Sequence, residues 1–346
     1  MAYSYQSGVN LGGWISQYRQ PTKEHFETFI VAQDIERIAT WGMDHVRLPV
    51  DYPVIEDDDR PGEYKEEGLE YIDRCLTWCQ SYDLGLILDL HRAPGYSFGH
   101  LDSNSLFDSK EDQDRYIQLW QNLARRYHGT DDGLQLELLN EVVEPNSDRW
   151  NRLAHQTIAA IRAIDPTRSI IYGGNHYNSI DHLSAIDWLP DDDHIVYTFH
   201  FYKPHLFTHQ NAPWSEITRE YAKTIHYPGG FPDLDQFVAD HPGLPDVKLL
   251  QQDHPEHADR DLLRQLLEPA TAFVEATGKP VYCGEYGVIE HAPLASRIAW
   301  HRDFVGLLRD LSIGRAVWSY KAMSFGLVDA SGHVLSEELI SIVSQS

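Results

Sequence analysis

Two glutamates stand at the ends of apolar runs that are rich in β-branched and aromatic residues. One run, LQLELLNE (134–141), closes on Asn140-Glu141, and another, KPVYCGEYG (279–287), contains Glu285. Two carboxyls on different strands suit hydrolysis of a glycosidic bond. That reaction needs one carboxyl kept protonated, to donate to the leaving oxygen, and another kept ionised beside the anomeric carbon. The sequence therefore predicts a paired-carboxylate site.

Four further apolar runs also end in a polar or amphipathic side chain. The residues concerned are Arg47, His91, His200 with Tyr202, and Trp318. Arg47 and Tyr202 would hold one carboxylate ionised, the first by charge and the second by hydrogen bonding. Taken singly, an arginine is often a structural ion pair and a histidine a satisfied core residue. Six strand ends that all carry such side chains favour one shared site instead.

Glu137 and Glu144 flank the first of the two glutamates. Residues four apart in a strand share a face, so we expect Glu137 and Glu141 to point into the same interior, with Glu137 one layer deeper. This depth predicts that Glu137 is a buried structural partner, for example of Arg47. Glu144 lies beyond the expected strand and is predicted to lie at the surface or at the rim of the substrate site.

The elements that must position these residues alternate regularly. Eight short runs rich in Val, Ile and Tyr are separated by segments whose apolar residues return every three or four positions. This alternation predicts an α/β fold, a single (β/α)8 TIM barrel over residues 1–346, whose active site forms at the C-terminal ends of the strands. The expected strands are 8–14, 45–50, 84–91, 134–141, 169–175, 194–202, 279–287 and 314–321.

Helical periodicity is clearest at 32–42, 68–83, 112–129, 149–165 and 262–278. Gly42, Gly129 and Gly278 close three of these segments, as left-handed helix caps do. No GxGxxG motif follows a strand and no P-loop is present, so the sequence gives little support to nucleotide binding.

Two long connections are expected at the barrel mouth. Residues 203–260, after the sixth strand, are rich in Pro, Gly, His and Asp, and we expect an elaborated loop over the mouth. The segment HRAPGYSFG (91–99), after the third strand, carries Tyr96 and Phe98. These two side chains either shape the substrate site or serve in ordinary loop packing.

Composition limits the partners. Lys+Arg number 28 against 53 Asp+Glu, for a net charge of −25, which repels nucleic-acid backbones and anionic membrane surfaces but not a neutral sugar. Three cysteines are too few for a disulfide framework and are expected to be reduced thiols. The N-terminal residues lack a signal-peptide pattern and no long apolar run occurs, so we expect a cytoplasmic protein. The sequence does not indicate an oligomeric state.

The motifs GVNLGGW, HVRLPV, LDLH, LLNE, YTFHFY, GEYG and VWSYK together resemble glycoside hydrolase family 5, the cellulase and mannanase family of retaining (β/α)8 barrels. The resemblance runs from Gly8 to about Asp329. It implies that Glu141 is the acid/base and Glu285 the nucleophile, and that no metal or organic cofactor is needed. The other roles that it implies are Asn140 on the sugar 2-hydroxyl, Arg47 and Tyr202 as supports of the nucleophile, His91 and His200 lining the subsite, and Trp318 as the stacking floor.

One feature departs from the family pattern. Members usually have proline directly after the acid/base glutamate, whereas Val142-Val143-Glu144 precede the proline here. This puts the shape of the local loop in question more than the role of Glu141, because the proline does no chemistry.

The sequence indicates the mechanism more narrowly than it indicates the substrate. Without an export signal, and with a long loop that could close one end of the cleft, we expect an exo-acting β-mannosidase or β-glucosidase on β-linked oligosaccharides. The alternative is an endo-β-1,4-glucanase or mannanase. A metal-dependent barrel hydrolase is a remote alternative, suggested by Asp89-Leu90-His91 but opposed by the lack of histidine in GVNLGGW. A non-catalytic carbohydrate-binding barrel is opposed by the presence of both glutamates.

Overall fold

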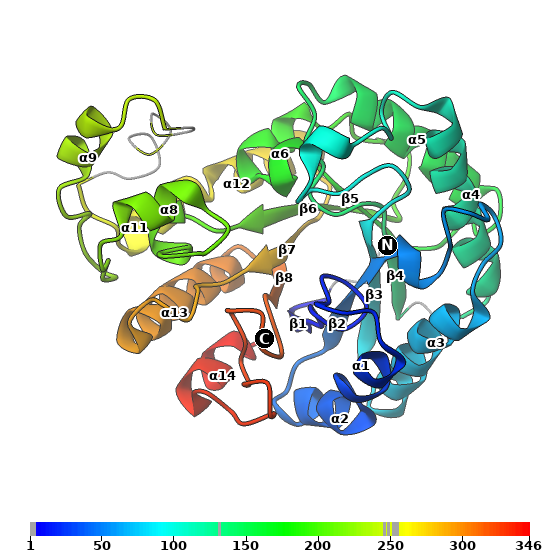
Figure 1. The fold of residues 1–346 in the computed structure, drawn as a ribbon, viewed down its shortest axis with the longest axis horizontal. Coiled ribbons are helices and arrows are strands. Elements are labelled where there is room, and N and C mark those ends of the chain that lie inside the picture. Colours follow the sequence, from blue (N-terminus) through cyan, green and yellow to red (C-terminus); the bar gives the residue numbers. More distant parts are fainter. Residues whose placement is uncertain (1–4, 131–132, 245–246, 248–249, 251–255) are drawn as a thin grey trace.

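A computed structural model describes residues 5–130, 133–244, 247, 250 and 256–346. Eight parallel strands form a closed barrel in which each strand pairs with its neighbours in sequence and β8 pairs with β1 (Figure 1). The predicted (β/α)8 barrel is therefore confirmed. The strands are β1 (Ser7–Asn10), β2 (His45–Asp51), β3 (Gly85–Arg92), β4 (Leu134–Glu137), β5 (Ile170–Gly173), β6 (Ile195–Phe201), β7 (Val281–Tyr286) and β8 (Gly314–Val317).

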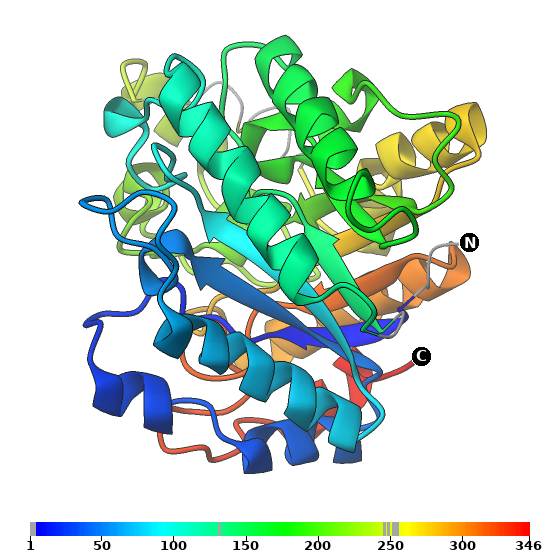
Figure 2. The ribbon, with the colours of Figure 1, turned by 90° about the vertical axis from the view of Figure 1, so that its right-hand side faces the viewer.

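The strands are nearly continuous apolar runs because both of their faces are covered. Their outward side chains pack under the helices, and Figure 2 shows α3 and α4 lying along the outside of β2 and β3. The helices are α1 (Lys23–Thr28), α2 (Ala32–Thr40), α3 (Glu66–Ser81), α4 (Lys110–Arg126), α5 (Asp148–Arg162), α6 (Asn175–Asn178), α7 (His205–Thr208), α8 (Glu216–Tyr221), α9 (Leu234–Asp240), α11 (Arg260–Leu266), α12 (Glu268–Thr277), α13 (Leu294–Asp310) and α14 (Glu337–Val343).

The predicted helix caps are confirmed, but one predicted helix is two. Gly42, Gly129 and Gly278 follow α2, α4 and α12 with φ of +87°, +81° and +67°, the left-handed backbone that glycine adopts without a steric cost. The segment predicted as one helix at 262–278 breaks between α11 and α12. Pro269, at the start of α12, explains the break, since proline cannot donate the hydrogen bond that would continue the helix.

The barrel interior is filled by side chains in layers. A small apolar cluster plugs it, formed by Tyr5, Ile87, Ile171, Val196, Tyr282 and Ala316. Arg47 pairs with Ile87, a member of this cluster, and Asp89, two residues further along β3, pairs with Glu137. The layer next to the cluster is therefore polar. Arg47, Asp89 and Glu137 are all fully buried. This buried polar layer separates the apolar plug from the barrel mouth.

The connection between β6 and β7 is largely helical. It contains α7, α8, α9, α11 and α12, and Figure 1 shows α8 and α9 to one side of the strands, with α8 next to α11 and α9 farthest from the barrel. In the described part of the chain, the expected cover over the mouth is formed by residues 209–214, whereas α8 and α9 lie to the side of the barrel. Residues 209–214 are the part of this segment nearest to the strand ends, where Ala212 packs with Trp318.

Two further expectations concern the chain as a whole. Cys75, Cys79 and Cys283 are free and buried, as predicted. Within the described ranges no helix combines the length and the apolar character needed to cross a membrane.

Candidate active site

Arg47 organises the polar layer from the middle of β2. Its Nε and Nη2 donate to the two oxygens of Glu137 at 2.7 and 2.8 Å, which confirms the predicted contact between these residues. Nη1 donates to Oδ1 of Asn10 at 2.9 Å and to Oε1 of Glu285 at 2.8 Å. A planar guanidinium with five fixed donors can serve several strands at once, which a lysine ammonium cannot.

Asp89 and His91 extend this network along β3. Oδ2 of Asp89 lies 3.0 Å from Nη2 of Arg47 and 2.7 Å from Nδ1 of His91. Burial raises the pKa of Asp89 to about 7, although the charge of Arg47 lowers it in opposition. Burial also lowers the pKa of His91, so this ring is neutral at the pH of most cells.

Glu285 lies on β7 with both carboxylate oxygens engaged. Oε1 accepts from Arg47 at 2.8 Å, and Oε2 accepts from the Tyr202 hydroxyl at 2.9 Å, just beyond β6. Burial raises the pKa of Glu285, while the nearby His200 and Arg47 lower it in opposition. Both hydrogen bonds go to the carboxylate as acceptor, so they favour its ionised form.

Glu141 has a different environment from the one expected. The predicted strand to residue 141 ends at Glu137, and Glu141 lies in the following loop with φ of +45°. A left-handed backbone costs a residue other than glycine about 1–2 kcal/mol. The assumption that Glu137 and Glu141 share a strand face is therefore wrong. Glu141 nevertheless turns toward the barrel axis, where Oε1 lies 2.8 Å from Nδ1 of His200.

The two glutamates differ in what surrounds their carboxyl groups. Burial raises the pKa of Glu141 to about 7, and only the more distant charges of His91 and Arg47 lower it in opposition. The His200 ring beside it is neutral, since burial lowers the pKa of this histidine to about 4. Glu141 thus lacks a direct cationic partner, whereas Glu285 has Arg47. This asymmetry is what an acid and an ionised partner require.

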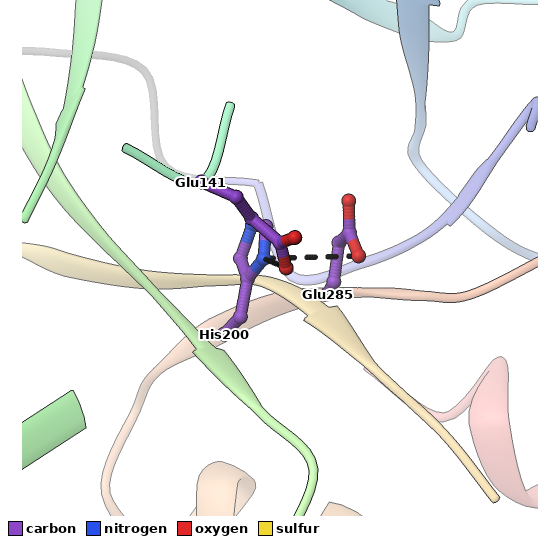
Figure 3. A group of neighbouring side chains, drawn as sticks. All are labelled: Glu141, His200 and Glu285. Atoms are coloured by element: carbon purple, nitrogen blue, oxygen red, sulfur yellow. Dashed lines mark hydrogen bonds and ion pairs between the residues drawn. The ribbon is translucent and has the colours of Figure 1, made fainter. Parts of the chain in front are cut away.

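Glu141, His200 and Glu285 face one another across the mouth (Figure 3). One carboxylate oxygen of each glutamate and a ring nitrogen of the histidine lie within 4.8 Å of one another. Retaining glycosidases hold their two carboxyls about 5–5.5 Å apart and inverting enzymes about 6.5–9.5 Å. The nearest oxygens of the two glutamates thus lie closer than the inverting range, on the side of the retaining arrangement.

The same three side chains could in principle hold a metal ion. Both oxygens of Glu285 already accept hydrogen bonds, one of them from the guanidinium of Arg47. A metal ion on this carboxylate would lie next to a permanent positive charge, which disfavours it. The donors present thus suit a carboxylate pair better than a metal centre.

Trp318 follows β8 and forms one wall of the site. Its ring stacks on His91 with 5.7 Å between ring centroids and 4° between planes. Gly12, after β1, allows this placement, because a Cβ there would lie 2.7 Å from the indole. The ring is 6% exposed and packs with Phe325 and the half-buried Tyr202.

Three buried polar atoms near the carboxylates have no partner among the described residues: Nδ2 of Asn140, Nε2 of His91 and Oδ1 of Asn178. Buried polar groups are rarely left unpaired, so such atoms point to a bound polar ligand or water. Asn140 also accepts a hydrogen bond from Nη2 of Arg47 at 2.9 Å, which orients its amide. The amide is therefore fixed with a free N–H donor.

Comparison with known proteins agrees with this geometry. The family model Cellulase (glycosyl hydrolase family 5) matches residues 6–324. The chain belongs to glycosyl hydrolase family 5. This family 5 protein is thus a glycoside hydrolase, as the sequence predicted, and it acts on β-linked saccharides.

Named relatives and solved structures support the same assignment. Endoglucanase C of Acetivibrio thermocellus is 49% identical over 99% of this chain and 98% of its own length. Cellodextrinase A of Ruminococcus flavefaciens is 36% identical over 85% of this chain and 79% of its own. The structure of Thermotoga maritima Cel5A in complex with cellobiose has a TM-score of 0.77 at 21% identity, covering 98% and 97% of the two chains, and supports the fold.

These relatives bear on the expected substrate of the family 5 enzyme. The relative at 49% identity is named an endoglucanase, and neither relative is named a mannosidase. The comparisons therefore favour the endo-acting alternative over the exo-acting β-mannosidase or β-glucosidase that we expected from the sequence.

The structure also places side chains that sequence reasoning missed. Asn10, at the end of β1, orients Arg47, and Nδ2 of Asn178 lies 3.4 Å from Nε2 of His200. Asp89 was noted only as a metal ligand and instead pairs with Arg47. Asn10 and Asp89 lie on predicted strands. The alternation of side chains along a strand could therefore have predicted that both point into the barrel. Asn178 is the last of three left-handed residues that no sequence pattern marked.

Two loop predictions have clear outcomes. Glu144 is half-buried and forms an ion pair with Arg149, 3.1 Å away, beyond the end of β4. Phe98 packs edge-on against His91 with 5.2 Å between centroids, so it supports a side chain of the site. Tyr96 is buried and contacts the backbone around Glu141.

Proposed function

We propose that this family 5 enzyme is a retaining endo-β-1,4-glucanase that works by double displacement. The observation that carries the proposal is the pair Glu141 and Glu285, within 4.8 Å of one another and in opposite electrostatic environments. The choice of a glucan as the substrate rests on the relatives named endoglucanase and cellodextrinase. The catalytic machinery is proposed to lie in a single domain, with no cofactor.

In the first step, an Oε of Glu285 attacks the anomeric carbon while Glu141 donates its proton to the leaving glycosidic oxygen. The bond between anomeric carbon and leaving oxygen breaks, and a glycosyl ester of Glu285 forms. Arg47 and Tyr202 keep the attacking carboxylate ionised before this step. The raised pKa of Glu141 keeps a proton available near neutral pH.

In the second step, Glu141, now ionised, removes a proton from water as the water attacks the anomeric carbon. The ester bond breaks, Glu285 leaves as a carboxylate, and the product keeps its β configuration. His200 is neutral and forms a hydrogen bond with Glu141. A neutral imidazole has one donor and one acceptor nitrogen, so it can pair with Glu141 both when Glu141 is protonated and when it is ionised.

The other side chains of the site bind the sugar. The unpaired N–H of Asn140 is placed to bind the 2-hydroxyl, and Nε2 of His91 is available to a second hydroxyl. Trp318 is proposed to bind the C–H groups of the pyranose with its aromatic ring, whose orientation is fixed by stacking on His91. A polar edge and an apolar face together match the two surfaces of a β-glucoside.

Hydrolysis of carboxymethylcellulose and cellohexaose tests the proposal. We expect viscosity to fall early, products of intermediate length, and the β anomer as the first product in proton NMR. Glu285→Gln serves as the inactive control. Release of α anomer first would refute retention, and release of short terminal products without loss of viscosity would instead favour the second candidate, a cellodextrinase, which the relative from R. flavefaciens supports.

A further inference from the structure

The backbone around Glu141 has an unfavourable conformation that other residues must maintain. Glu141 has φ of +45°, and no proline follows it to restrict the loop. Among the described residues, His200 is the only hydrogen-bond partner of the Glu141 carboxyl. The position of the carboxyl therefore depends on how residues 141–144 are held.

The hydroxyl of Tyr96 provides one attachment. It donates to the carbonyl oxygen of Glu141 at 2.8 Å and accepts from the N–H of Val143 at 2.7 Å. Tyr96 comes from the loop after β3 and is 3% exposed. A neutral phenol has one proton to donate and lone pairs to accept, so a single hydroxyl bridges the two sides of the left-handed turn.

Asn175 provides a second attachment from the loop after β5. Its Oδ1 accepts from the N–H of Glu144 at 2.8 Å and its Nδ2 donates to the carbonyl of the same residue at 2.9 Å. The next residue but one, Tyr177, donates its backbone N–H to the carbonyl of Val142 at 3.0 Å. Every residue from 141 to 144 thus has a backbone hydrogen bond to one of two neighbouring loops.

The loop after β5 is itself held in an unfavourable conformation. Residues 176, 177 and 178 have φ of +51°, +61° and +52°, a left-handed run that is rare for residues with side chains. Such strain persists only where surrounding contacts over-determine the backbone, and it concentrates at functional sites. Here the run presents Asn175 and Tyr177 to the Glu141 loop, and it also places Asn178 next to His200.

We propose that Tyr96 and Asn175 are positioning residues that aim the carboxyl of Glu141 at the leaving glycosidic oxygen. Their hydrogen bonds restrict the loop that a proline directly after the glutamate restricts in other family members. The proposal rests on the proposed acid/base role of Glu141. Proton donation depends on placement to within a fraction of an ångström, so loosening this loop weakens acid catalysis more than it weakens attack by Glu285.

The leaving group of the substrate separates these two effects. Phenolate is a poor leaving group and needs a proton from the acid, whereas 2,4-dinitrophenolate leaves without one. The experiment compares kcat/KM for phenyl β-cellobioside and 2,4-dinitrophenyl β-cellobioside, because this parameter reports the steps up to glycosyl-enzyme formation. Purely structural damage lowers both values together.

For Tyr96→Phe we expect kcat/KM on the phenyl substrate to fall about 10-fold to 10²-fold, with the dinitrophenyl substrate nearly unchanged. The matched control is Tyr197→Phe, which removes another buried hydroxyl, one that accepts a backbone N–H from Leu189 at 2.8 Å. This control should leave both substrates unaffected. Asn175→Ala should repeat the selective loss, and it carries the comparison if Tyr96→Phe does not fold.

Glu141→Ala separates this inference from the proposed function. If Glu141 is the acid, its removal lowers kcat/KM on the phenyl substrate by about 10²-fold to 10⁴-fold and spares the dinitrophenyl substrate. An equal loss on both substrates would overturn the acid assignment and, with it, the positioning role. If Glu141→Ala is selective but Tyr96→Phe and Asn175→Ala lower both substrates equally, or neither, the positioning role alone is refuted.

Discussion

The protonated state of Glu141 has a cost in stability, which the substitution Glu141→Gln measures. Burial raises the pKa of this carboxyl from 4.5 to about 7 on folding. Below pH 4.5 the group is protonated in both states and has no effect. Between pH 4.5 and 7 the folded state binds more protons, so the free energy of unfolding falls as pH rises, by 1.36 kcal/mol per unit. The total is about 3 kcal/mol above pH 7.

Glutamine has the same shape and no proton to lose, so the variant does not have this cost. We expect Glu141→Gln and the parent protein to be about equally stable at pH 4.5, and the variant to be about 3 kcal/mol more stable at pH 8. Titrating groups that do not interact with Glu141 are present in both proteins and cancel in the difference.

Urea unfolding followed by tryptophan fluorescence at several pH values between 4.5 and 8, with refolding checked at each, gives the difference directly. A difference in unfolding free energy that does not change with pH would refute the argument, since it would mean that Glu141 titrates alike in the folded and unfolded chain. The same variant should be inactive on cellohexaose, which links the gain in stability to loss of the acid.

Two further predictions concern the same network. kcat/KM on cello-oligosaccharides should decline as pH rises through about 7, because Glu141 then loses its proton in the free enzyme, and a basic limb above pH 9 would contradict this. Arg47→Lys should lower kcat and also lower the free energy of unfolding by about 2 kcal/mol or more, because an ammonium cannot replace the bonds to Asn10, Glu137 and Glu285. Arg149→Lys, at the half-exposed pair with Glu144, is the matched control, and an equal effect there would contradict the special role of Arg47.

The sequence predicted the barrel well for a clear physical reason. Strands buried on both faces are nearly continuous apolar runs apart from the polar residues of the site, and caps such as Gly278 require a left-handed backbone that few residues adopt. All eight strands were legible in this way, as were the helical segments that contain α2, α3, α4, α5, α11 and α12. The short helices α7, α8 and α9 have too few residues to show a period, and α13 buries Arg297 and His301 among its apolar residues, so these helices were not predicted.

The site was predictable where strand ends alone determine position. Arg47, Glu285 and Tyr202 lie on or next to strands and meet as the barrel geometry requires. The conformation of Glu141 was not predictable, because it depends on Tyr96 and Asn175, which are 45 and 31 residues away from their partners in the chain. Contacts between loops of this kind leave no periodic pattern in the sequence.

The contacts of Arg47 also bear on how the chain is made. Glu285 follows Arg47 by 238 residues, and Glu137 follows it by only 90, so synthesis delivers the two acidic partners at very different times. Domains generally fold as units during synthesis. Glu137 and Asp89 are the two acidic partners of the guanidinium that are present in the chain once β4 has been made. A chain that still lacks the strand with Glu285 therefore already carries two carboxyl groups that can neutralise Arg47.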